Sequence, residues 1–177
     1  MKTNVIVLKE YELNPYTMII RPKGVNGQIC SEIVETDGKY ICTKSPFKLV
    51  KRSCKYFGST YEGRKTATKE LIEVSVKPPI IIDPHTSIFL FPTASPLTPH
   101  CIWVSHEHVK KYQMGERHST IVTFENDEQY ELLISHRSFD VQMQRTALLR
   151  IRYMQNIKRM KHYRTGETAE IKRSYLT

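Results

Sequence analysis

The feature that most restricts the fold of this chain is a change in hydrophobic period near residue 134. Before that point, short apolar runs are separated by turn signals, and in the last of them apolar side chains recur at every second position, which is typical of β-strands. After it, apolar residues recur every three or four positions through a long stretch, which predicts one amphipathic helix. The chain is therefore expected to be an α+β protein with a strand-rich body and a long C-terminal helix.

Two hairpins are predicted within the strand-rich part. Residues 33–36 and 39–42 flank Asp37-Gly38, and a two-residue Asp-Gly link favours a type I′ turn, in which both central residues have positive φ. Residues 120–124 and 129–134 form the second pair. Further expectations are a strand at 71–76, short apolar strands at 80–82 and 88–91 joined by Asp83-Pro84, and an ordered proline-rich loop at 92–100.

A short basic helix is predicted near residues 46–57. Ser45 suits the N-cap position, Pro46 suits the first helical position, and Gly58 suits the end of the helix. Apolar residues recur at helical spacing, and positive charges take the remaining positions: Phe47, Val50, Cys54 and Phe57 on one face, and Lys48, Lys51, Arg52 and Lys55 elsewhere. The next stretch, residues 58–69, is polar and bounded by glycine, which predicts a loop.

The long C-terminal helix is expected to begin at Ser138, which can act as its cap. Its predicted apolar face consists of Phe139, Met143, Ala147, Ile151, Met154, Ile157 and Met160. Three arginines, Arg145, Arg152 and Arg159, lie opposite, each pair separated by about 10.5 Å along the axis. Such a row can follow a phosphate backbone or be an ordinary solvated face. Arg150 projects near the apolar stripe, so we expect it to pair with another group or to mark an oligomer contact.

Positive charge is concentrated in two segments of a chain whose formal net charge is +9. Residues 44–69 contain eight basic residues and one acid, and residues 137–173 contain ten basic residues and three acids. The rest of the chain is mildly acidic. This distribution is typical of a protein with an anionic partner, although two solvated basic faces would give the same count.

Several classes of protein are not favoured by the sequence. A chain of 177 residues supports one domain, or one domain with a tail, and no apolar run approaches the roughly 20 residues that cross a bilayer. The N-terminus is too short in apolar residues for a secretory signal. The four cysteines, Cys30, Cys42, Cys54 and Cys101, include no C-x-x-C pair and are expected to be buried thiols, since nothing points to an oxidising compartment. We expect a cytoplasmic protein.

Candidate catalytic and metal sites are incomplete. Residues 58–66 resemble a phosphate-binding P-loop, but Arg64 is inserted before the lysine and no apolar strand leads in. His106 and His108 would point to one side of a strand, near His100 and Cys101, yet the convergence that zinc needs is not established by sequence. Cys54 and Cys101 lie in apolar surroundings, which is unlike a reactive thiolate. We expect no catalytic residue, metal or cofactor, and therefore no enzyme.

Nucleic acid is the partner that the pattern favours. Basic residues interleaved with tyrosine, serine and threonine neutralise phosphates and add neutral donors. No zinc-finger spacing, leucine zipper or clear helix-turn-helix is present, so we expect Arg64 and Lys65 to enter the minor groove from a loop. The candidate DNA contacts are Lys51, Arg52, Lys55, Tyr61, Arg64, Lys65, Arg145, Arg152 and Arg159. The alternatives are a basic module for RNA or an acidic protein, or a regulatory paralogue without activator function.

Several long strings resemble the bacterial competence transcription factor (ComK) family. They are RSCKYFGSTYEGRK at 52–65, KPPI at 77–80, DP at 83–84, IFLFPT at 88–93, CIWVSH at 101–106, HV at 108–109, RTA at 145–147 and LR at 149–150. The resemblance implies an activator of genes for DNA uptake and transformation. It also implies recognition of A/T-rich boxes largely from the minor groove, by dimers that act in pairs on nucleoid DNA, and recruitment of RNA polymerase.

From this resemblance we expect residues 1–164 to form a single DNA-binding domain of this family, followed by a short C-terminal tail at residues 165–177. Members of the family usually continue into a tail that the MecA adaptor recognises for delivery to the ClpC/ClpP protease. The last residues here do not resemble that tail. Control by this adaptor is therefore not expected.

Overall fold

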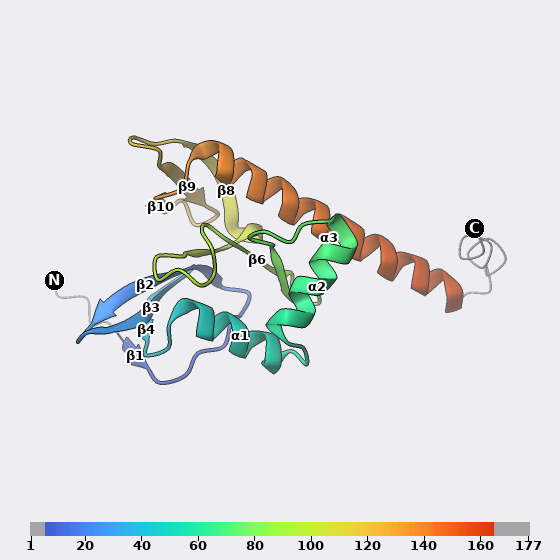
Figure 1. The fold of residues 1–177 in the computed structure, drawn as a ribbon, viewed down its shortest axis with the longest axis horizontal. Coiled ribbons are helices and arrows are strands. Elements are labelled where there is room, and N and C mark those ends of the chain that lie inside the picture. Colours follow the sequence, from blue (N-terminus) through green and yellow to red (C-terminus); the bar gives the residue numbers. More distant parts are fainter. Residues whose placement is uncertain (1–5, 165–177) are drawn as a thin grey trace.

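The computed structural model describes residues 6–164, which form ten strands, three α-helices and one 3₁₀-helix (Figure 1). The elements are β1 (Ile6–Leu8), β2 (Thr17–Val25), β3 (Gln28–Glu35), β4 (Lys39–Cys42), α1 (Pro46–Tyr56), α2 (Tyr61–Ile72), β5 (Ile80–Asp83), β6 (Ile88–Pro92), β7 (Trp103–Ser105), η1 (His106–His108), β8 (Val109–Met114), β9 (Thr120–Phe124), β10 (Gln129–Leu132) and α3 (His136–Arg164). The predicted α+β, strand-rich class with a long C-terminal helix is confirmed.

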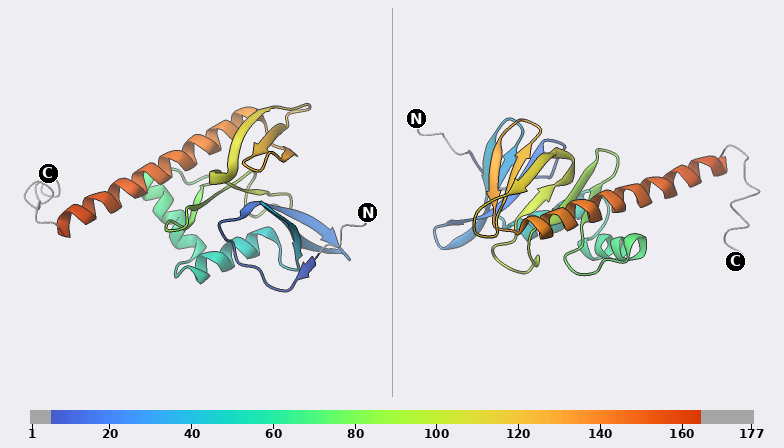
Figure 2. Two further views of the ribbon diagram at one scale, coloured as in Figure 1. Left: turned by 180° about the vertical axis from the view of Figure 1, so that it is seen from behind. Right: turned by 90° about the horizontal axis from the view of Figure 1, so that it is seen from above.

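The strands form two sheets that share a core. The larger has the order β1-β4-β3-β2-β7-β6-β5, and the smaller has the order β10-β9-β8. Because neighbouring residues of a strand face opposite sides, Ile20 and Ile33 pack toward α1 and the start of α2, whereas Ile19 and Val34 pack toward the smaller sheet. The larger sheet is therefore covered on both faces (Figures 1 and 2).

Two hairpins differ from the expectations in their turns. The hairpin β3–β4 is confirmed, but neither Asp37 nor Gly38 has positive φ, so the predicted type I′ turn is wrong. The chain closes instead through a bond from the Glu35 amide to the Gly38 carbonyl, 2.8 Å long. A two-residue turn with positive φ at both positions joins β2 to β3 instead, where Asn26 and Gly27 have φ values of 48° and 75°.

The expected strands in the second half of the chain have mixed outcomes. The hairpins β5–β6 and β9–β10 are confirmed, as is the loop after β6. The predicted strand at 71–76 is wrong, because Leu71 and Ile72 complete helix α2 and the residues after them are irregular. The Asp83 carboxylate stabilises the β5–β6 turn by accepting bonds from the Thr86 amide and hydroxyl, 3.1 and 2.6 Å long.

Helix α3 and its cap lie three residues earlier than predicted. The Ser138 amide donates to the hydroxyl of Ser135, 3.2 Å away, so Ser135 and not Ser138 precedes the helix as its cap. The buried side chains of α3 are Phe139, Gln142, Thr146 and Leu149. The predicted face is correct at its start and wrong further on, since Ile151, Met154 and Met160 are each about half exposed (53%, 49% and 52%).

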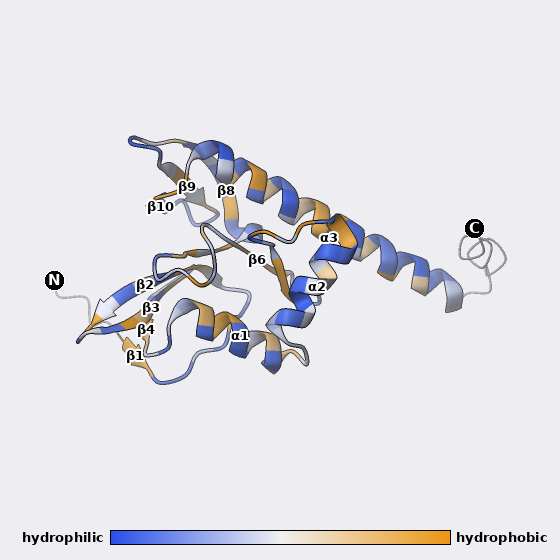
Figure 3. Ribbon diagram, in the orientation of Figure 1, coloured by the Kyte–Doolittle hydropathy of each residue, from blue (hydrophilic) through white to orange (hydrophobic). Residues whose placement is uncertain are grey.

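The polar side chains in the buried stripe of α3 explain this difference. Gln142 donates to the carbonyls of Pro92 and Lys77, at 2.7 and 3.0 Å, and Thr146 donates to the carbonyl of Gln142 at 2.7 Å. A buried polar group with such partners avoids most of the cost of leaving water, so burial here does not follow hydropathy. The second half of α3 extends beyond the body of the protein and is mostly hydrophilic (Figures 2 and 3).

Arg150 anchors α3 to η1. Its guanidinium forms an ion pair with Glu107 and lies 5.7 Å from the centre of the Phe89 ring. The expectation that this arginine pairs with another group is confirmed. Arg150 thus lies near the apolar stripe because it makes a polar contact between α3 and η1.

His106 makes this junction sensitive to pH. Burial lowers the pKa of His106 below its usual value near 6.5, and the nearby charge of Arg150 lowers it further. The imidazole is thus neutral in the folded protein under conditions that protonate it in the unfolded chain. Its full contribution to stability is present above about pH 6.5 and is lost as the pH falls from there toward the folded pKa.

We therefore expect His106→Gln to reduce the pH dependence of unfolding between pH 7.5 and 5. Urea unfolding of the wild-type protein and of the His106→Gln variant across this pH range measures the effect. The two proteins differ only at residue 106, so the difference between the two curves isolates His106. Parallel curves would show that His106 does not contribute.

Candidate nucleic-acid interface

Helix α1 presents a basic face to solvent. Its opposite face is buried through Leu49, Val50, Ser53 and Cys54, which places Lys48, Lys51 and Lys55 on the exposed side. No acidic residue occurs in α1, and hydrophobic and hydrophilic positions alternate along it (Figure 3). Ser45 occupies the N-cap and Pro46 the first position, as predicted, although the serine side chain makes no capping bond.

The three lysines are available to an anionic partner. Within residues 6–164, none of them forms an ion pair with a carboxylate. The Lys51 ammonium lies 4.7 Å from the centre of the Phe47 ring, which fixes its direction without neutralising its charge. Lys48 was absent from the predicted contacts, although its spacing of three and seven residues from Lys51 and Lys55 places all three on one helical face.

Arg52 is engaged differently from its neighbours. Its Nε donates to Glu12 at 2.8 Å, and its two terminal nitrogens donate to Glu10 at 3.1 and 2.7 Å. The bond to Glu12 is the largest of the interactions that raise the pKa of Arg52. Arg52 therefore holds the segment after β1 against α1, and its charge is already balanced.

We expect Arg52→Ala to leave the salt dependence of DNA binding unchanged, because a paired guanidinium displaces no counterion from DNA. Lys55→Ala, one turn further along α1, should reduce the slope of log affinity against log salt by about 0.9. Fluorescence anisotropy of a labelled duplex at several salt concentrations compares the two variants. An equal reduction in both would show that Arg52 leaves its carboxylates to bind phosphate.

Residues 61–72 form helix α2, so the predicted loop at 58–69 is wrong beyond residue 60. The hydroxyl of Thr60 accepts a bond from the Gly63 amide, 3.0 Å long, and caps the helix. Only Phe57 to Thr60 separate α1 from α2. Arg64 and Lys65 thus lie in the first half of a helix, and neither projects from a flexible loop.

Two other predicted contacts, Tyr61 and Arg64, lie close to the core. Tyr61 is 6% exposed, and its ring packs edge-on against Phe47 at 4.9 Å and Trp103 at 6.4 Å. Burial raises the pKa of Tyr61 to about 12. Arg64 and Lys65 are half-buried, and Arg64 Nε has no partner within the described residues. These positions favour packing for Tyr61, whereas contact of DNA with Arg64 and Lys65 stays a prediction.

The three arginines of α3 are in distinct environments. Arg145 is half-buried and approaches the Val76 carbonyl at 3.5 Å. Arg152 and Arg159 are exposed and line a hollow of about 490 Å³ between α3 and the end of α2, where Glu70 and Glu73 also lie. Residues 141–164 contain no acid. This part of α3 is therefore a second basic surface, separate from α1.

The comparisons with known proteins assign the chain to a family. The model of the family described as ComK protein matches residues 8–158. The chain belongs to the ComK family. It is 45% identical over 150 residues to the competence transcription factor of Bacillus subtilis (strain 168), and the match covers 85% of this chain and 78% of that protein. No solved structure matches the chain.

The part that matches the ComK family contains all of both sheets except Ile6 and Val7, helices α1 and α2, and α3 as far as residue 158. Both basic surfaces therefore fall within it, apart from the outermost residues of α3. The resemblance inferred from the sequence strings is confirmed over this range. The matched range also contains the loop between β6 and β7, in which Leu97 lies.

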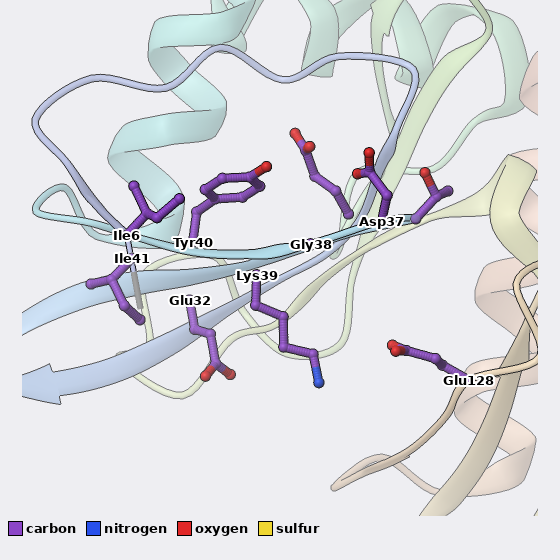
Figure 4. Close-up of a pocket in the computed structure, with 10 residues that line it drawn as sticks. Ile6, Glu32, Asp37, Gly38, Lys39, Tyr40, Ile41 and Glu128 are labelled. Carbon is purple, nitrogen blue, oxygen red and sulfur yellow. The ribbon is translucent and has the colours of Figure 1, made fainter. Parts of the chain in front are cut away.

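A hollow of about 640 Å³ near the β3–β4 turn has the opposite charge. Figure 4 shows Glu32 and Lys39 on one side of the sheet, with Glu128 approaching from the smaller sheet. Glu35 and Asp37 add two more carboxylates. Glu32 is paired with Arg21 and Lys23, but the three other acids outnumber the one lysine of the hollow, so phosphate would still meet negative charge there.

The structure bears on the metal site and the reactive thiols that were weighed from the sequence. His106 and His108 lie in the 3₁₀-helix η1, so the strand geometry proposed for a metal pair is wrong. Among residues 6–164, no three histidine, cysteine or acidic side chains are placed to share a metal ion. Burial raises the pKa of Cys54 to about 11 and also raises that of Cys101, so both are thiols near neutral pH.

Among the described residues, no helix combines the length and the apolar composition that a bilayer crossing requires.

Proposed function

We propose that this protein is a sequence-selective DNA-binding activator of competence genes. It binds A/T-rich boxes largely through the minor groove, acts as dimers in pairs on nucleoid DNA in the cytoplasm, and recruits RNA polymerase. One observation carries the proposal: a member of the ComK family, 45% identical to a competence transcription factor, has three lysines on one face of α1 that form no ion pair within the described residues. The chemistry of that face is that of a phosphate-binding surface.

The geometry supports a duplex as the ligand. Three lysines within two turns of α1 are spaced to meet neighbouring phosphates, and Arg152 and Arg159 on α3 offer a second basic surface. A/T-rich tracts have a narrow minor groove with enhanced negative potential, which attracts lysine and arginine. Selectivity for such tracts can thus come from groove shape without a recognition helix.

Fluorescence anisotropy tests the proposal. A labelled duplex with two A/T-rich boxes and a G/C-rich duplex of equal length are titrated with the protein at several salt concentrations. The proposal predicts tighter binding to the A/T-rich duplex that persists as salt rises. Equal affinities that fall together would favour the alternative of a basic module for RNA or an acidic protein partner.

A further inference from the structure

The loop between β6 and β7 exposes a large apolar side chain beside the N-terminal end of α1. Leu97, near the middle of this loop, is 83% exposed. Leu97 and Pro96 line a hollow of about 230 Å³ whose other side includes Pro46 and Phe47 of α1. The loop lies above the first turn of α1 in Figure 1. An exposed leucine therefore stands next to the helix that carries Lys48 and Lys51.

The backbone holds Leu97 in place. Pro96 and Pro99 fix φ on either side of it. The Thr98 amide and hydroxyl both donate to the Ser95 carbonyl, at 2.9 and 2.7 Å. At the base of the loop, Thr93 and Ile102 are joined by a backbone bond of 2.9 Å. The loop is thus ordered, so presenting this leucine to a partner costs little additional conformational entropy.

The surroundings restrict what this leucine contacts. Leu97 shares its hollow with Ile29, which is 45% exposed, and the apolar area of these two side chains is too small for a stable protein interface by itself. Proteins that bind the minor groove insert leucine, proline or similar side chains between base pairs, while neighbouring cations hold the phosphates on either side. The combination of a rigid leucine, flanking prolines and the lysines of α1 matches these requirements.

We propose that Leu97 is an apolar wedge that inserts between two base pairs in the minor groove of the A/T-rich site. The inference rests on the proposed function and adds to it the side chain that reads deformability. Pyrimidine–purine steps such as TA unstack most easily, so the wedge favours them within A/T-rich boxes. The lysines of α1 hold the backbone next to the opened step.

The test uses 2-aminopurine, an adenine analogue whose fluorescence rises when it unstacks. A set of duplexes with two A/T-rich boxes carries a single 2-aminopurine at successive adenine positions. We expect the wild-type protein to brighten the probe at a particular step. Leu97→Ala should abolish that rise and weaken binding about tenfold, as expected for loss of a buried leucine contact. The salt slope should not change, because leucine displaces no counterion.

Two controls separate the wedge from other effects. Leu97→Met keeps an apolar side chain of similar size and should retain both the fluorescence rise and the affinity. Leu133→Ala removes another leucine, 90% exposed between β10 and α3, and should behave as wild type. Circular dichroism confirms that each variant is folded.

The outcomes distinguish this inference from the proposed function. If the wild-type protein prefers the A/T-rich duplex but brightens no probe position, the wedge is wrong and the proposed function stands. The wedge is also wrong if Leu97→Ala binds and brightens the probe as wild type does. If the wild-type protein shows no preference for A/T-rich DNA, both proposals are overturned.

Discussion

Replacing Lys48, Lys51 and Lys55 together with alanine is expected to abolish most DNA binding. If each lysine neutralises one phosphate, the slope of log affinity against log salt falls by about 2.7, and affinity near 0.1 M salt falls on the order of 10²- to 10³-fold. The three side chains are exposed and alanine is a strong helix former, so α1 should remain folded. Anisotropy of a labelled A/T-rich duplex across a salt series measures both quantities.

A matched control removes lysines from another exposed surface. Lys110 and Lys111 of β8 are both exposed, and Lys110 is paired with Asp127 at 2.6 Å. The double variant Lys110→Ala with Lys111→Ala should keep the wild-type salt slope. A triple α1 variant with an unchanged slope would place the DNA contact elsewhere on the protein, with the α3 surface as the next candidate.

Phe139→Ala is expected to cause the largest loss of stability among the substitutions considered. Phe139 is fully buried at the start of α3. The centre of its ring lies 5.3 Å from the ring centre of Phe91 in the larger sheet and 4.9 Å from that of Tyr112 in the smaller sheet. Truncation removes the aromatic contact among three elements and leaves a cavity. The free energy of unfolding should fall by about 3–5 kcal/mol.

Urea unfolding measures this loss, with Leu133→Ala as the control. Leu133 is 90% exposed, and its truncation should change the free energy of unfolding by no more than about 0.5 kcal/mol. A loss below about 1 kcal/mol for Phe139→Ala would contradict the packing of α3 against the two sheets, since buried aromatic truncations normally cost several times that amount.

Helix α2 shows why sequence alone missed part of the candidate interface. Few of its side chains are apolar, so hydropathy does not predict a helix. Propensity alone does favour one, because most residues after Gly63, such as Arg64 and Lys65, are strong helix formers. The Thr60 cap was a local signal. The larger contribution is tertiary, because Tyr61 packs into the core and the buried Thr68 hydroxyl donates to the Pro79 carbonyl at 2.7 Å. Contacts of this kind stabilise helices that are marginal in isolation.

The sequence was more successful where local rules agree with the tertiary fold. Ser45, Pro46 and the apolar spacing predicted α1 nearly to the residue, and the period change near residue 134 predicted α3. The buried face of α3 was predicted incorrectly because Gln142 and Thr146 are buried with hydrogen-bond partners that only the folded chain supplies. The Asn26-Gly27 turn was a strong signal that went unused.

Counts of charge identified the basic segments without identifying the free charges. Arg52 and Lys55 are equivalent in the sequence, but Glu10 and Glu12, about forty residues earlier, neutralise only the arginine. Pairing over such a distance depends on the fold and cannot be read from a window of sequence. The structure thus leaves α1 as a candidate site and replaces Arg52 with Lys48 as its third cation without an ion pair among residues 6–164.

Substituting inosine·cytosine pairs for adenine·thymine pairs in the boxes tests the central claim most directly. An I·C pair has the minor groove of A·T, because it lacks the guanine amino group, and the major groove of G·C. If this protein reads the minor groove, anisotropy should give affinities for the A·T and I·C duplexes that agree closely, both well above that for G·C. An I·C duplex that binds as weakly as G·C would contradict minor-groove recognition.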